Sequence, residues 1–236
     1  LEVPEASSFD PGQQRIQDRF LLMYTSGSTG NPKGIYVYYD RLQDAVIWAD
    51  RVWPYTPDDK LYTGLALTHG NAVWLTMYPA LYRRIPAIIS RKFTKSRLWD
   101  ICRKYGCTTF SLLGGMMTGI YSEPERPDDG HNPVNMVLSA GTPKGIWKSF
   151  EKRFNVTIHE WYDSMEGGFC HNPPGVGPIG SIGKPLPDMV EIKVVREDDT
   201  ECNPGEIGEL IARNVACETK VEYHNNPKAS AESTRG

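Results

Sequence analysis

Two kinds of apolar segment alternate along the chain between residues 19 and 163. Some are short runs rich in aromatic and β-branched residues, such as GIYVYY at 34–39, and these are typical of strands. The segments between them carry apolar residues at helical spacing, as residues 98–105 do. Strands that alternate with helices of about 10 to 15 residues favour βαβ units. The sequence therefore predicts an α/β fold with a mainly parallel central sheet.

Local sequence signals give the expected bounds of these elements. The expected strands are 19–24, 34–39, 60–67, 85–90, 108–114, 135–141 and 156–162. Asp40 and Thr94 are expected to cap helices at their N-termini, and Gly106 is expected to end the second of these. A third helix is expected over 71–84, and a fourth from Pro143, because proline is favoured in the first helical turn.

The chain changes character after about residue 170. Residues 171–187 are rich in Gly and Pro and predict turns without a helix. Two runs, 189–195 and 206–212, flank a polar stretch and predict a β-hairpin with a long loop. The last residues are polar, predicting only a short helix near Pro227 and no apolar face. We therefore expect an α/β subdomain over 1–170 and a β-rich subdomain over 171–236.

The composition narrows the class of protein. The 236 residues carry a net charge of −3, which gives no electrostatic reason to expect nucleic acid or an anionic membrane as a partner. Five cysteines without a CxxC pair argue against a disulfide framework or a zinc site. No apolar run approaches the ~18 residues that span a bilayer, and the first residues do not resemble a signal peptide. These features favour a soluble protein of the cytoplasm.

Residues 25–34, TSGSTGNPKG, lie between two expected strands. They do not match the Walker A spacing, in which Ser or Thr follows the lysine, so a P-loop ATPase is the weakest alternative. The glycines permit close backbone approach, the hydroxyl groups can donate hydrogen bonds, and Lys33 adds positive charge. Short Gly/Ser loops are often plain turns, but ten such residues between strands favour a site for a polyphosphate.

This loop resembles the phosphate-binding loop of the adenylate-forming superfamily, which includes acyl- and aryl-CoA synthetases, peptide-synthetase adenylation domains and beetle luciferases. Further segments resemble the family's motifs in the family's order. They are LALTHGNA at 65–72, VLSAGTPKGIWKSFEKRF at 137–154, HEWYDSMEGG at 159–168, and two stretches of the β-rich part at 180–195 and 203–214. The subgroup that the chain resembles most is that of carnitine/crotonobetaine-CoA ligases and related fatty-acyl-CoA ligases.

The resemblance implies site residues, each with an ordinary structural alternative such as core packing or a solvated surface position. Tyr162 is implied to stack on adenine, Glu166 to hold Mg²⁺, and His69 to position the carboxylate substrate. Thr29, Lys33, His69 and Glu166 are the implied catalytic residues. The implied nucleotide-binding residues are Thr25, Ser26, Gly27, Ser28, Thr29, Gly30, Lys33, Gly141, Thr142, Pro143, Trp161, Tyr162, Asp163, Ser164, Met165 and Glu166.

The chain departs from the family pattern in sequence and in extent. Asp163 stands where the family usually has Gly, and an aspartate close to a triphosphate is repelled unless Mg²⁺ lies between them. Met165 stands where a Thr hydroxyl usually binds the α-phosphate, and its sulfur is only a weak acceptor; Ser164 is a possible substitute. The chain begins just before the loop and stops before the family's T-G-D motif. We therefore expect the central part of a longer enzyme, inactive alone.

The implied reaction activates a carboxylic acid with ATP to an acyl-adenylate and transfers the acyl group to CoA, releasing AMP. This makes the chain part of an AMP-forming acid-thiol ligase, with a small carboxylic acid and CoA as partners and a homodimer as a possible assembly. Two alternatives stay open: an adenylation module that loads a carrier protein, and a non-catalytic relative that only binds the nucleotide. The sequence does not identify the acid.

Overall fold

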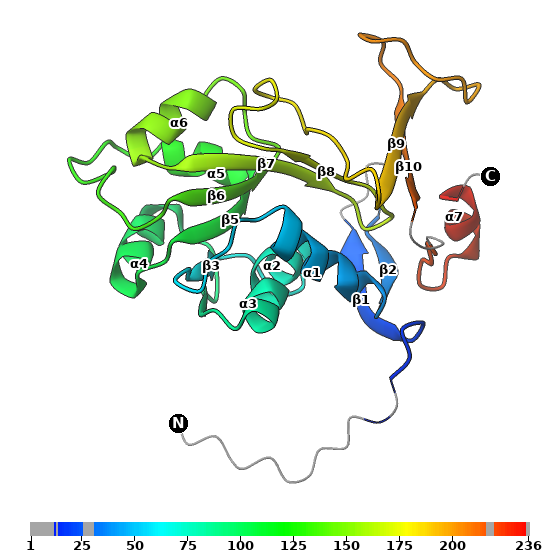
Figure 1. Ribbon diagram of the computed structural model, residues 1–236, viewed down its shortest axis with the longest axis horizontal. Helices are drawn as coiled ribbons and strands as arrows, with labels where there is room; N and C mark the ends of the chain where they lie inside the picture. Colours follow the sequence, from blue (N-terminus) through cyan, green and yellow to red (C-terminus); the bar gives the residue numbers. More distant parts are fainter. Residues whose placement is uncertain (1–11, 13, 26–30, 216–219, 235–236) are drawn as a thin grey trace.

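The structure is a computed structural model that describes residues 12, 14–25, 31–215 and 220–234. Its largest sheet has six strands in the order β4-β3-β5-β6-β7-β8 (Figure 1). The strands are β3 (Leu61–Thr63), β4 (Ala87–Ile89), β5 (Thr109–Leu113), β6 (Met136–Ala140), β7 (Thr157–Asp163) and β8 (Phe169–Asn172). Neighbours from β4 to β7 are parallel, whereas β8 is antiparallel to β7. The predicted mainly parallel sheet is confirmed.

Helices cover both faces of this sheet. They are α1 (Arg41–Arg51), α2 (Gly70–Ala72), α3 (Tyr78–Arg83), α4 (Leu98–Tyr105), α5 (Gly114–Tyr121) and α6 (Trp147–Phe154). Figure 1 shows α1, α2 and α3 on one side of the sheet, opposite α5 and α6. Neighbouring strand residues join different cores, since Leu138 packs with the α1 side and Val137 with the α4–α6 side. This alternation follows from the two-residue period of a strand.

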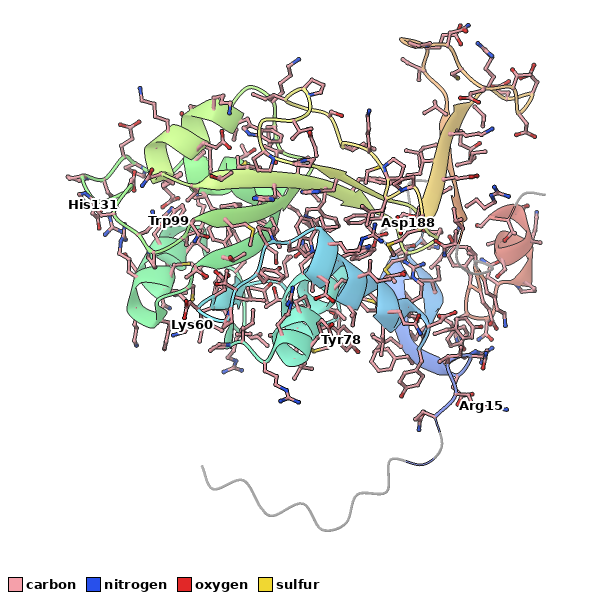
Figure 2. All side chains as sticks on the ribbon, in the orientation of Figure 1. Arg15, Lys60, Tyr78, Trp99, His131 and Asp188 are labelled. Carbon is pink, nitrogen blue, oxygen red and sulfur yellow. The ribbon has the colours of Figure 1, made fainter. Side chains whose placement is uncertain are left out.

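Aromatic residues fill the second of these two cores. Trp99 on α4 lies edge-on to Phe110 on β5, with ring centroids 5.6 Å apart, and stacks on Phe154 of α6 at 4.5 Å (Figure 2). Such pairs add to the stabilisation that burial of the rings provides. The apolar spacing in 98–105 predicted the burial of Leu98 and Cys102 on α4, but Tyr105 at the same spacing is 42% exposed, and the buried Trp99 lies outside that spacing.

The hairpin of β1 (Arg19–Thr25) and β2 (Lys33–Tyr38) is separate from the six-stranded sheet. The two strands are antiparallel, with Thr25 opposite Lys33. The expectation that they alternate with helices in the parallel sheet is therefore wrong. Only seven residues connect them, whereas parallel strands need a crossover of about a dozen residues or more.

The C-terminal part agrees with prediction in one hairpin and one helix. Strands β9 (Val190–Val195) and β10 (Glu209–Asn214) pair antiparallel, as predicted, and α7 (Pro227–Glu232) begins at the expected proline. The expectation of no apolar face there is wrong, because Tyr223 and Ala229 are buried in the first core. The division near residue 170 stays a prediction, and β8 lies across it.

Several expected bounds and caps differ from the structure. Asp40 and Thr94 precede helical turns, but neither side chain makes a capping hydrogen bond. Pro143 forms a turn, in which its carbonyl accepts the N–H of Ile146, and the helix begins at Trp147. Gly106 ends α4 in the left-handed conformation, as expected.

Three other expected segments are altered in length or burial. Residues 71–84 are helical, but Val73–Met77 form a π-helical turn between α2 and α3. The strand expected over 60–67 is reduced to β3, and the strand expected to be buried over 85–90 is the edge strand β4, in which Ile89 is 47% exposed. Within the described residues, no helix combines the length and hydropathy that crossing a bilayer requires.

Candidate functional site

Two predicted motifs and the first residue of α5 meet at one edge of the central sheet. Because β5, β6 and β7 are parallel, their carboxyl ends lie side by side. Gly114 follows β5, the Gly141–Pro143 segment follows β6, and Ser164–Glu166 follow β7. Open α/β sheets bind ligands outside the carboxyl ends of their strands. The topology therefore makes this edge the candidate site.

A buried carboxylate holds the segment that follows β6. Glu160 on β7 is 3% exposed, and its Oε1 accepts the N–H of Gly141 at 2.7 Å. Its two oxygens also accept the N–H of Thr142 at 3.2 and 3.1 Å, and the Thr142 hydroxyl donates to Ser139 Oγ at 2.6 Å. Burial raises the pKa of Glu160, and these hydrogen bonds oppose the rise. The predicted adenine-site loop is thus fixed from inside the protein.

Sequence reasoning missed Glu160. The available signal was a glutamate inside a strand, next to the apolar Trp161, since a fully buried carboxylate needs hydrogen-bonding partners. The second missed residue is Gly114, the first residue of α5: a Cβ there would lie 1.9 Å from the Gly141 carbonyl oxygen. Gly141 itself has a φ of 75°, which favours glycine.

The residues at the end of β7 point in different directions. Trp161 is buried in the first core, whereas Tyr162 is half-buried and burial raises the pKa of its hydroxyl. The side chain of Asp163 is 7% exposed and turns toward α1, with Oδ1 4.0 Å from Nη2 of Arg41. Burial raises the pKa of Asp163 to about 7, against the opposing effect of Arg41. The Asp163 carboxyl thus faces α1. The expected repulsion between Asp163 and a triphosphate stays a prediction.

The two residues after Asp163 link this turn to the predicted acid-binding segment. The Ser164 hydroxyl donates to the carbonyl of Gly167 at 2.9 Å. Met165 lies against the start of α2, where its sulfur is 3.3 Å from the position of a Cβ on Gly70. The structure therefore brings segments 65–72 and 159–168 into contact.

His69 precedes α2 and acts as its N-cap. Its Nδ1 accepts the N–H of Asn71 at 3.1 Å, and desolvation lowers the pKa of the imidazole. The cap occupies one ring nitrogen and leaves Nε2, on an exposed side chain, for another partner. His69 thus has a structural role in the fold, and its role toward a substrate stays a prediction.

Lys33 and Glu166 both contact Tyr223, a residue that sequence reasoning did not select. The Tyr223 hydroxyl donates to Glu166 Oε1 at 2.5 Å, and Lys33 Nζ lies 5.2 Å from the centre of the Tyr223 ring. Thr25 Oγ1 is 3.5 Å from the carbonyl oxygen of Lys33. Of the predicted phosphate loop, Ser26, Gly27, Ser28, Thr29 and Gly30 lie outside the described residues.

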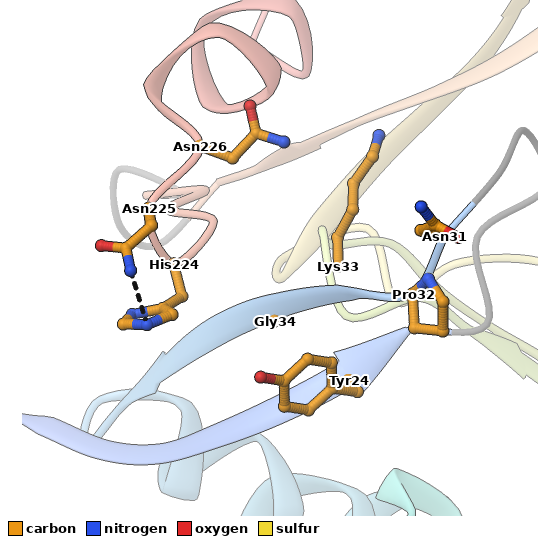
Figure 3. Close-up of a pocket in the computed structure, with 8 residues that line it drawn as sticks. All are labelled: Tyr24, Asn31, Pro32, Lys33, Gly34, His224, Asn225 and Asn226. Atoms are coloured by element: carbon orange, nitrogen blue, oxygen red, sulfur yellow. Dashed lines mark hydrogen bonds between the residues drawn. The ribbon is translucent and has the colours of Figure 1, made fainter.

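A pocket of about 370 Å³ adjoins Lys33 (Figure 3). Besides Lys33 it is lined by Tyr24, Asn31, Pro32, Gly34, His224, Asn225 and Asn226. In Figure 3, Lys33 and Asn226 extend on the same side of β2. A lysine, three carboxamides and an imidazole form a polar lining suited to a charged, hydrogen-bonding ligand.

The residues present fit a magnesium ion held jointly with a nucleotide. In the described part of the chain, no three His, Cys, Asp or Glu side chains gather as a metal cage, and no basic side chain lies within ion-pair distance of Glu166. Mg²⁺ commonly takes one or two carboxylates and completes its shell with phosphate oxygens and water. The single half-buried carboxylate of Glu166, whose partner Tyr223 also contacts Lys33, matches that donor set.

Comparisons with known proteins agree with this geometry. A medium/long-chain-fatty-acid–CoA ligase, FadD17 of Mycobacterium marinum, is 32% identical over 220 residues, which are 93% of this chain and 43% of that protein. The solved structure of a benzoate CoA ligase from Burkholderia xenovorans matches with a TM-score of 0.81 at 20% identity, over 94% of this chain and 45% of that one. Likeness at that identity shows the shared fold.

A second solved structure is o-succinylbenzoate CoA synthetase from Bacillus subtilis in complex with ATP and magnesium ion. It matches with a TM-score of 0.78 at 22% identity, over 94% of this chain and 46% of that one. The chain thus spans less than half the length of these three proteins. The profile of the AMP-binding enzyme family matches residues 2–217, so the chain belongs to the AMP-binding enzyme family.

Proposed function

We propose that this chain forms the nucleotide-binding part of an AMP-forming acid-thiol ligase. The observation that carries the proposal is the meeting of Lys33 and Glu166 at one tyrosine ring, next to the carboxyl ends of the parallel strands. A cation for phosphate oxygens and a carboxylate for Mg²⁺ are the two groups that binding of a metal–nucleotide complex requires.

In this proposal each described residue acts on one part of ATP. Lys33 would neutralise phosphate charge together with Thr25 and the loop that follows it. The Gly141–Pro143 segment, held by Glu160, would line the adenine, and Tyr162 would stack on it. Glu166 would hold Mg²⁺, which, when bound, supplies positive charge against the phosphate oxygens.

The acid would enter beside His69 and Met165. A carboxylate oxygen would attack the α-phosphorus of ATP, breaking the bond to pyrophosphate and forming an acyl-adenylate. The CoA thiol would then attack the acyl carbon and displace AMP. Holding both reactants in line accounts for much of such a rate enhancement. Because two relatives at 32% and 30% identity are medium/long-chain-fatty-acid–CoA ligases, we propose a fatty acid as the substrate class.

Two further parts of the proposal rest on the sequence. A cytoplasmic location is proposed because five cysteines without a CxxC pair fit a reducing compartment, and a homodimer is proposed as the assembly to test by light scattering. Transfer to a carrier protein instead of CoA is distinguished by supplying each acceptor to the preformed acyl-adenylate.

The test is ATP–pyrophosphate exchange in the protein as its gene encodes it. The acids are short-chain, long-chain, aryl and carnitine-like carboxylates, with Glu166→Ala as the inactive control. We expect long-chain acids to stimulate exchange most and Glu166→Ala to abolish the stimulation. ATP binding without exchange for any acid would contradict the proposal and favour a non-catalytic relative, with Met165 as the first residue to change to Thr.

A further inference from the structure

Tyr223 has a fixed position because its backbone continues the β1–β2 hairpin. It bridges Ile35, while the neighbouring His224 donates its N–H to the carbonyl of Gly34 at 2.7 Å. The N–H of Tyr223 donates to Ser230 Oγ at 2.9 Å, which ties the residue to α7. With a side chain that is 6% exposed, Tyr223 has little freedom to move its ring.

The ring and the hydroxyl of Tyr223 contact different partners. The ring lies 5.2 Å from Lys33 Nζ, a cation–π distance, whereas the hydroxyl donates to Glu166 Oε1 at 2.5 Å. A hydrogen bond to a carboxylate is stronger than one between neutral groups. In the part of the chain that the structure describes, no ion pair competes with this bond for the Glu166 carboxylate.

We propose that Tyr223 is a positioning residue that orients the Glu166 carboxylate for Mg²⁺; this inference rests on the proposed function. The hydroxyl would hold Oε1 and leave Oε2 to bind the metal. Groups that hydrogen-bond to metal ligands set ligand orientation, and their loss typically costs about 10–100-fold in metal affinity or activity. The C-terminal segment thereby contributes to a site whose other residues come from β2 and the end of β7.

A Phe substitution separates the two contacts of Tyr223. Tyr223→Phe keeps the aromatic ring beside Lys33 and the buried volume, and it removes the hydrogen bond to Glu166 together with the interaction of the hydroxyl with Ser233. A purely structural role would change stability, whereas a positioning role would change metal binding at unchanged nucleotide binding. The matched control is Tyr55→Phe, in which a buried tyrosine loses a 3.1 Å bond to the carbonyl of Leu75 and no contact with a predicted site residue.

The probe is Mn²⁺, whose free concentration is read by electron paramagnetic resonance in the presence of saturating ATP. We expect Tyr223→Phe to bind Mn²⁺ about tenfold more weakly, with metal-free ATP binding in EDTA unchanged. Tyr55→Phe should match the wild type in both. Unchanged Mn²⁺ affinity in Tyr223→Phe would overturn the inference. Tighter binding would overturn it as well, because the hydroxyl would then compete with the metal.

A second pair of variants tests the inference if Tyr223→Phe folds poorly. At position 223, p-methylphenylalanine fills the hydroxyl volume without donating, and p-aminophenylalanine restores a donor. Only the second should bind Mn²⁺ with near wild-type affinity, and equal affinities would count against the inference. Failure of the proposed function looks different: the wild type itself would then bind no Mn²⁺–ATP complex or show no acid-dependent exchange.

Discussion

The carbonyl oxygen of Gly141 lies where a side chain on Gly114 would begin, 1.9 Å from the position of its Cβ. Real Cβ contacts are never this short, so the first turn of α5 and the loop after β6 pack together only because residue 114 is glycine. The loop in turn carries the predicted adenine contacts, Gly141, Thr142 and Pro143. A glycine in one element therefore sets the position of a binding loop in another.

Gly114→Ala is expected to weaken AMP binding by at least tenfold. The added methyl group must displace the Gly141 carbonyl, and a displacement of about 1 Å in a site can cost about 100-fold. Isothermal titration calorimetry with AMP measures the effect. Gly115→Ala is the matched control, because no atom lies within 4 Å of its Cβ position and both changes favour the helix equally. Equal AMP affinities in the two variants would show that the loop is not held by this contact.

Glu160→Gln is expected to lower the free energy of unfolding by about 1–3 kcal/mol and to weaken AMP binding as well. The carboxylate accepts the N–H groups of Gly141 and Thr142, whereas a carboxamide would turn a donor toward one of them and leave it unsatisfied. Urea denaturation measures the stability. Glu191→Gln, an exposed residue paired with Arg213, should change it by less than about 0.5 kcal/mol. A similar loss in both variants would contradict the buried role of Glu160.

Asp163→Asn is expected to reduce the loss in the free energy of unfolding that occurs as the pH rises from about 4 to about 7. The folded protein holds the pKa of this buried carboxyl at about 7, above its ordinary value. The folded state therefore binds the proton more tightly than the unfolded state, so this contribution to stability is complete below about pH 4 and is lost as the pH rises through 7. Urea midpoints at pH 5, 6, 7 and 8 give the slope, and an unchanged slope in Asp163→Asn would refute the assignment.

His171→Phe is expected to make the protein more resistant to acid. His159 and His171 stack with centroids 5.8 Å apart, and burial lowers the pKa of each to about 4. These neutral imidazoles stabilise the fold above about pH 6.5, and their contribution is lost as the pH falls through 4. Phe keeps the edge contact with Trp53.

The measurement for this variant is the difference in Tm between pH 7.5 and pH 5. It should shrink by a few degrees in His171→Phe, since about 1 kcal/mol corresponds to roughly 2–4 °C in a chain of this size. His131→Gln, an exposed histidine, should leave the difference as it is in the wild type. If the Tm difference between pH 7.5 and pH 5 is as large in His171→Phe as in the wild type, other groups cause the acid sensitivity.

Local sequence was sufficient to predict the kinds of elements and the family. Periodicity and turn residues act over a few positions, so the runs around β5, β6 and β7 and the hairpin of β9 and β10 were predictable. The order of the motifs along the chain was sufficient to name Lys33, Gly141–Pro143 and Glu166 as predicted site residues, and their roles stay predictions. Local signals placed the start of α1 after Asp40 correctly but not a capping hydrogen bond, and they failed at Pro143, which forms a turn before the helix begins at Trp147.

The residues that act together were set by the tertiary fold. Tyr223 and Glu166 are 57 positions apart and Glu160 and Gly141 are 19 apart, so no local pattern joins them. The same holds for the direction of Asp163, which turns toward Arg41 on α1. Burial, steric exclusion and hydrogen bonding act between segments that only folding brings into contact. For that reason the sequence could identify the motifs of this site but not the residues that hold them in place.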